Sequence, residues 1–83
     1  MSNKILPVIA ALHERAENIR NIELEKSLKH MPNLNGEEQA KVEALTRAIV
    51  SRLLHVPTSK LRHTDCAVEY ASILNELFEL NIQ

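Results

Sequence analysis

The strongest pattern in the chain is a mostly apolar stripe between residues 42 and 54. Its residues recur every three or four positions, so they fall on one face of an α-helix: Val42, Leu45, Thr46, Ile49, Val50, Leu53 and Leu54. Arg47 and Arg52 lie on the other side of the same helix. The apolar face is broader than a small monomer can cover, which predicts that part of it contacts a partner.

A second stripe runs along the first third of the chain. Five small or apolar residues are spaced four, three, four and three apart, as in a heptad repeat: Ile5, Ile9, Leu12, Ala16 and Ile19. Glu23 takes the next position, where a carboxylate needs a partner. Three arginines could supply one across a helix or subunit boundary: Arg15, Arg20 and Arg52. Pro32 disfavours helical geometry in the residue before it, so we predict one long helix over residues 5–31.

Local signals set the other helix boundaries. Asn35 and Glu38 have the spacing of a capping box, which predicts that a second helix begins at Gly36. Pro57 is expected to end that helix, giving residues 36–55 and then a short separate turn. A third helix is predicted over residues 65–80, capped by Thr64 or Asp65. Its expected apolar face consists of Ala67, Tyr70, Ile73, Leu74, Leu77 and Phe78.

The composition favours an all-α protein. The chain has one glycine and two aromatic residues, whereas 45% of its residues are apolar. Sheets need more turns and more β-branched residues than this. Short connections favour antiparallel packing of consecutive helices. At 83 residues we expect one domain, residues 1–83, forming an antiparallel bundle of three main helices completed by homodimerisation.

Charge and targeting signals exclude several classes of function. The net charge is −1 and the two signs are interspersed, which argues against a surface for nucleic acid or membrane. The N-terminal apolar run is too short to span a bilayer and lacks the features of a signal peptide. Cys66 is the only cysteine, so no internal disulfide can form, which suits a reducing cytoplasm.

No residue pattern predicts catalysis or a metal site. The four histidines do not have the spacing of zinc ligands: His13, His30, His55 and His63. We interpret His55 as a structural residue that bonds free carbonyls at the end of the second helix. Cys66 is expected to be a buried or half-buried thiol, because it has no evident activating base.

Several short segments together carry a resemblance to a known family. They begin with Leu6–Arg20, Glu23–Glu25 and Leu28, and continue with Pro32–Leu34, Glu37–Glu38, Leu45–Thr46, Ile49, Leu53–His55 and Pro57–Thr58. In order and spacing they resemble the end of the spinal helix and the C-terminal dimerisation domain of glutamyl-tRNA reductase. The resemblance covers residues 5–62, and the third helix is consistent with it. His13 departs from the arginine usual in that family.

The resemblance implies a parent enzyme that reduces glutamyl-tRNA to glutamate-1-semialdehyde with NADPH, in tetrapyrrole synthesis. In that family other domains carry the cysteine nucleophile and the NADPH site, and Cys66 does not correspond to the nucleophile. It therefore implies no catalytic, cofactor-binding or metal-binding residue in this chain. Glutamyl-tRNA, and glutamate-1-semialdehyde aminomutase as the next pathway enzyme, would engage elsewhere on the assembly. The property that carries over is the homodimer.

Two other functions stay open. A helical adaptor would bind a different protein through the same apolar face. A helix-turn-helix nucleic-acid binder is disfavoured, because the second helix offers only Arg47 and Arg52 for recognition. We expect the dimer interface and core to comprise Ile9, Leu12, Ile19, Val42, Leu45, Ile49, Val50 and Leu53, with Glu23 and His55 as structural polar residues.

Overall fold

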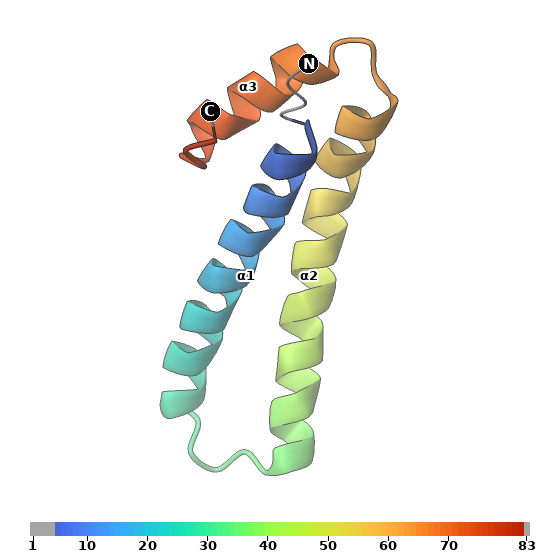
Figure 1. The fold of residues 1–83 in the computed structure, drawn as a ribbon. Coiled ribbons are helices and arrows are strands. Elements are labelled where there is room, and N and C mark those ends of the chain that lie inside the picture. The colour runs from blue at the N-terminus through green and yellow to red at the C-terminus, as the bar shows by residue number, and fades with distance from the viewer. Residues whose placement is uncertain (1–4, 83) are drawn as a thin grey trace.

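The computed structural model describes residues 5–82, which form three α-helices: α1 (Ile5–Lys29), α2 (Gly36–His63) and α3 (Ala67–Leu77). Helices α1 and α2 lie side by side and run in opposite directions, and α3 crosses the end where α1 begins and α2 ends (Figure 1). The molecule is elongated, with extents of 52 × 22 × 17 Å. The predicted all-α class and the three helices are confirmed.

The turn between α1 and α2 follows the predicted chemistry. The Asn35 side chain accepts a hydrogen bond from the Glu38 amide at 2.8 Å, and the Glu38 carboxylate accepts one from the Asn35 amide at 3.0 Å. This capping box fixes the start of α2 at Gly36. Helix α1 ends at Lys29, two residues earlier than predicted, and His30 and Met31 turn the chain ahead of Pro32.

The prediction that Pro57 ends the second helix is wrong, because α2 continues through Pro57 to His63. A proline inside a helix loses one backbone hydrogen bond and strains the preceding turn. Two contacts beyond it hold the helix in place. Leu61 is 1% exposed in the core, and the Thr58 hydroxyl lies 3.0 Å from Nε2 of His13 on α1. Tertiary packing therefore overrides the local preference of proline.

Helix α3 is shorter than predicted, and only Ala67 and Leu74 of its predicted face pack inward. It begins at Ala67, where Cys66 and not Thr64 or Asp65 is the capping residue, and it ends at Leu77. Ala67 and Ala71 are its buried residues. Large residues of the predicted face point partly into solvent instead: Tyr70, Ile73, Leu77 and Phe78. Small side chains let α3 approach α1 and α2 closely, which explains why the alanines face inward.

The core lies where the three helices meet. Its centre consists of Val8, Ile9, Leu61 and Ala71, with Ile5, Leu74, Leu80 and Ile82 packed around it. The Asn75 carboxamide holds the C-terminal segment in place, because it hydrogen-bonds both the amide and the carbonyl of Ile82. Further from α3, the facing sides of α1 and α2 bury only Leu12, Arg20, Leu24 and Leu54. That end of the molecule has little core of its own.

Candidate functional site

An apolar groove of about 590 Å³ runs along α1 and α2 and reaches the end of α3. Most of its lining is aliphatic: Leu12, Ala16, Ile19, Leu24, Val42, Ile49, Val50, Leu53, Leu54 and Leu74, with Pro57 and Phe78 at the α3 end. Five polar side chains also line it: Arg15, Arg20, Glu23, Ser27 and Thr46. A surface of this composition is suited to contact with another apolar surface.

The residues predicted as interface or core separate into two groups. Ile9 and Leu12 are buried within the single chain, and Val42 and Val50 are partly buried. Four large residues are at least half exposed: Ile19 53%, Leu45 60%, Ile49 51% and Leu53 70%. Ile19, Ile49 and Leu53 line the groove, and their place in a dimer interface stays a prediction.

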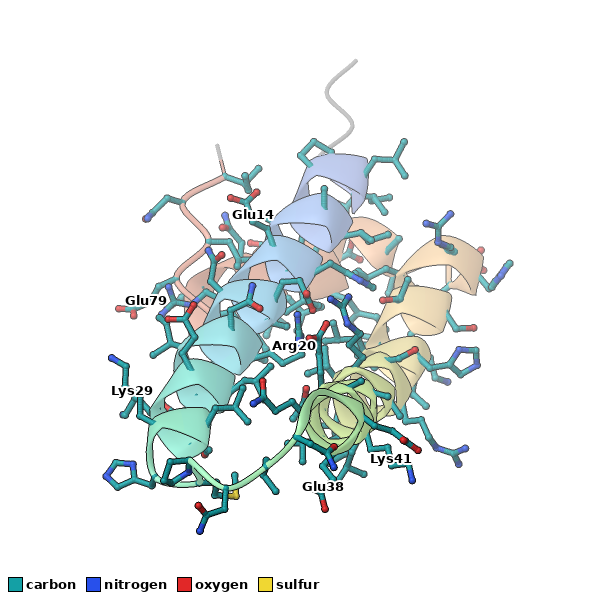
Figure 2. The ribbon with its side chains drawn as sticks, turned by 90° about the horizontal axis from the view of Figure 1, so that it is seen from below. Glu14, Arg20, Lys29, Glu38, Lys41 and Glu79 are labelled. Carbon is teal, nitrogen blue, oxygen red and sulfur yellow. The ribbon has the colours of Figure 1, made fainter. Side chains whose placement is uncertain are left out.

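The burial of Arg20 is the feature of the groove that the sequence analysis did not predict. Arg20 is the only buried charged residue among residues 5–82, with 5% of its surface exposed, and it lies between α1 and α2 (Figure 2). Its guanidinium donates to the Glu17 carboxylate at 2.6 and 2.9 Å, to the Asn21 side chain at 2.9 Å and to the Thr46 hydroxyl at 3.3 Å. The bond to Thr46 joins α1 to α2.

This polar network continues onto α2. The Thr46 hydroxyl donates to the Glu43 carbonyl at 2.7 Å, and Arg47 pairs with the Glu43 carboxylate at 2.7 Å. Arg47 also lies 3.9 Å from Glu17. Every buried side-chain nitrogen and oxygen in the described part of the chain has a hydrogen-bond partner. The groove therefore contains a cation that is already neutralised from within the same chain.

The network shifts the pKa values of its ionisable members. The hydrogen bond from Arg20 is the main cause that lowers the pKa of Glu17 from its ordinary value of 4.5, and the charges of Arg20 and Arg47 act in the same direction. Desolvation opposes them. The hydrogen bond to Glu17 likewise raises the pKa of Arg20. Both groups are charged at neutral pH, which suits a structural ion pair and not proton transfer.

Two predicted roles differ from the structure, and a third stays a prediction. Glu23 lines the groove, is exposed and pairs with Lys26 of its own chain at 3.4 Å, so an arginine partner across a subunit boundary stays a prediction. His55 lies in the middle of the α2 sequence, because the helix continues past Pro57, and its side chain is exposed to solvent. It therefore does not cap a helix end. Cys66 is exposed, not buried or half-buried, because it lies in the turn before α3.

Two further features were considered in residues 5–82, a metal site and a membrane-spanning helix. No three His, Cys, Asp or Glu side chains in this range gather closely enough to hold a metal ion. None of the three described helices is long and apolar enough to cross a bilayer. The apolar groove is thus the feature that a functional assignment has to explain.

Comparison with known proteins identifies the family of the chain. The family described as "Glutamyl-tRNAGlu reductase, dimerisation domain" matches residues 1–80. The chain belongs to this family. The resemblance inferred from the segment order is confirmed and extends further, because the match includes α3 as well as residues 5–62.

Individual relatives of this dimerisation domain agree. The chain is 44% identical to the glutamyl-tRNA reductase of Chloroflexus aurantiacus over 82 residues, which cover 95% of this chain and 19% of the relative. It is 42% identical to that of Natranaerobius thermophilus over 81 residues, covering 92% of this chain and 17% of the relative. The chain thus spans about a fifth of the length of the reductases it matches. No solved structure matches it.

Proposed function

We propose that this chain is the homodimerisation module of a glutamyl-tRNA reductase, and that a second copy covers the apolar groove. The observation that carries the proposal is the groove itself, since its walls are aliphatic and Ile19, Ile49 and Leu53 stand at least half exposed within it. A contiguous apolar surface of this kind marks an interaction site, and a symmetric pair of identical chains is the commonest way to cover one.

The surface area of the chain supports the same conclusion. A compact monomer of 9.4 kDa has an accessible surface of about 5,000 Å². This chain exposes 6453 Å². The excess is about 1,450 Å², whereas each partner in a standard protein interface buries about 800 Å². The elongated chain therefore exposes enough additional surface for a stable dimer.

The electrostatics of the groove are compatible with burial in an interface. An unpaired charge inside an interface costs several kcal/mol, and such a charge at the groove floor would oppose dimer formation. Arg20 is instead fully engaged by Glu17, Asn21 and Thr46 of its own chain. A second copy can cover the guanidinium without leaving it unpaired.

For the parent protein we infer the reaction that the relatives' name describes, the reduction of glutamyl-tRNA, in the cytoplasm. Its product would be glutamate-1-semialdehyde, and NADPH would supply the hydride for tetrapyrrole synthesis. NADPH does not fit the residues present here: a dinucleotide-binding loop needs several glycines after a strand, whereas Gly36 is the only glycine and begins α2 after a turn. NADPH, glutamyl-tRNA and the aminomutase would engage other parts of the parent, and this module would fix the geometry between two catalytic arms.

Sedimentation equilibrium at micromolar concentration tests the dimer. We expect the mass of two chains for the wild type, and a single-chain mass or loss of helical circular dichroism for Ile49→Asp. The substitution places a carboxylate in the interface, which costs several kcal/mol when the carboxylate finds no partner.

Ala44→Asp is the matched control, because Ala44 is exposed on α2 and does not line the groove. It should leave both mass and helical signal unchanged. A wild-type chain that sediments as a monomer at every concentration would contradict the proposal and favour a helical adaptor that binds a different protein.

A further inference from the structure

The exposed apolar stripe of α2 is palindromic, because its residue types and their spacing are the same in both directions along the helix. Its residues are Val42, Leu45, Ile49, Leu53 and Val56, spaced three, four, four and three apart. Val42 is partly exposed, and the other four side chains are each at least half exposed. A helix packed antiparallel against its own copy about Ile49 brings Leu45 opposite Leu53 of the partner subunit. It likewise brings Val42 opposite Val56 of the partner subunit.

Helix α1 carries a matching pattern of charge. Arg15, Ile19 and Glu23 are four residues apart and all line the groove. Antiparallel pairing about Ile19 places Arg15 and Glu23 about 6 Å to either side of the centre. Each Arg15 then faces Glu23 of the partner subunit, and the twofold symmetry produces this ion pair twice. Parallel pairing of the same helices would instead place like charges together.

The two centres lie at one level of the molecule. Arg20 on α1 bonds Thr46 on α2 at 3.3 Å, and Glu17 lies 3.9 Å from Arg47. These contacts place the turn of α1 that contains Ile19 next to the turn of α2 that precedes Ile49. A single twofold axis, perpendicular to both helices, can therefore pass through both centres.

We propose that the second copy docks antiparallel, α1 on α1 and α2 on α2, with two Arg15–Glu23 ion pairs fixing the register. This inference rests on the proposed homodimer and specifies its arrangement. The present partners of the two residues do not prevent it. Arg15 lies 3.8 Å from Glu79 and Glu23 lies 3.4 Å from Lys26, and both pairs are exposed, so little is lost when they rearrange.

Charge reversal tests the arrangement. Arg15→Glu brings two glutamates together at each contact, and Glu23→Arg brings two arginines together. We expect each variant alone to dimerise about tenfold more weakly than the wild type, because like charges across an interface repel. An equimolar mixture of the two variants restores both ion pairs, so we expect a heterodimer in native mass spectrometry. The double variant Arg15→Glu/Glu23→Arg should dimerise as the wild type does.

Two controls separate this result from other effects. Glu79→Ala removes the intrachain partner of Arg15, and Glu25→Arg adds a cation to α1 outside the groove lining. Neither should change the dimerisation constant by much. A wild-type dimer whose reversed variants fail to pair with each other would overturn the antiparallel register but leave the homodimer standing. A monomeric wild type would overturn both proposals.

Disulfide trapping gives an independent measurement. In a Cys66→Ser background, chains with Leu45→Cys and chains with Leu53→Cys should cross-link on oxidation when mixed. Neither should cross-link alone, because identical positions four residues from the axis lie about 12 Å apart along the helices. Efficient cross-linking of either variant with itself would contradict the register.

Discussion

At the scale of single residues, Arg20 is buried between α1 and α2 and joins them through its hydrogen bond to Thr46. Sequence reasoning singled out Glu23 as the charge that needs a partner, because Glu23 continues the heptad spacing of α1. The structure buries Arg20 instead, and its partners come from one turn away on α1 and from Thr46 on α2. The rotation of α1 about its own axis relative to α2 determines which of the two charged side chains faces inward. The spacing of residues along one helix does not predict that rotation.

The Arg20–Glu17 pair gives the chain a specific acid sensitivity. Because the pKa of Glu17 in the folded chain lies below its ordinary value of 4.5, the pair contributes stability that is fully present above that value. The contribution is lost as pH falls through the lowered pKa. We expect the melting temperature of the wild type to fall more steeply below about pH 4.5 than that of Glu17→Gln.

Thermal melts by circular dichroism between about pH 6 and pH 3 measure this difference. Glu25→Gln is the control, because it removes a carboxylate from α1 at an exposed position away from the groove lining. It should reproduce the wild-type slope. Equal slopes for the wild type and Glu17→Gln would show that the Arg20–Glu17 pair does not contribute to folding in this pH range.

At the scale of elements, the packing of α2 beyond Pro57 shows where sequence patterns stop being sufficient. The start of α2 was predictable, because Asn35 and Glu38 contact each other within one turn. Its end was not, because the helix past Pro57 is held by Leu61 and Thr58, whose partners lie on other helices. The inward face of α3 was predicted only in part for the same reason: Ala67 and Leu74 were expected there, whereas Ala71 is buried because α3 approaches the other helices closely.

Truncating Leu61 tests whether tertiary packing carries α2 through Pro57. Leu61 is 1% exposed where the three helices meet, so Leu61→Ala should cost about 2–5 kcal/mol of the free energy of unfolding. Urea denaturation measures the loss, and amide exchange should become faster in residues 58–63. Leu6→Ala removes the same atoms from an exposed position of α1 and should cost about 0.5 kcal/mol or less. Similar losses for the two variants would mean that Leu61 does not anchor the end of α2.

At the scale of the whole molecule, buried side chains are unevenly distributed along the 52 Å length. The three-helix end has a compact core, whereas the far end joins α1 to α2 through the Arg20 network and a few aliphatic contacts. The breadth of the α2 stripe predicted an exposed apolar surface, and the single chain has one. The proposed arrangement of a second copy needs two observations together. One is the palindromic spacing of the α2 stripe, and the other is that Ile19 on α1 lies at the same height along the molecule as Ile49 on α2.

A chain that completes its core with a second copy should melt at a temperature that depends on concentration. Dimer formation stabilises the folded state by mass action, so we expect the melting temperature to rise by about 5–10 °C for a hundredfold increase in concentration. Ile49→Asp, where it still folds, should melt at one temperature throughout, because it gains nothing from a partner. Differential scanning calorimetry across the concentration series measures both. A wild-type melting temperature that does not change would mean that one copy folds without help from the groove, and that the apolar surface serves a partner other than itself.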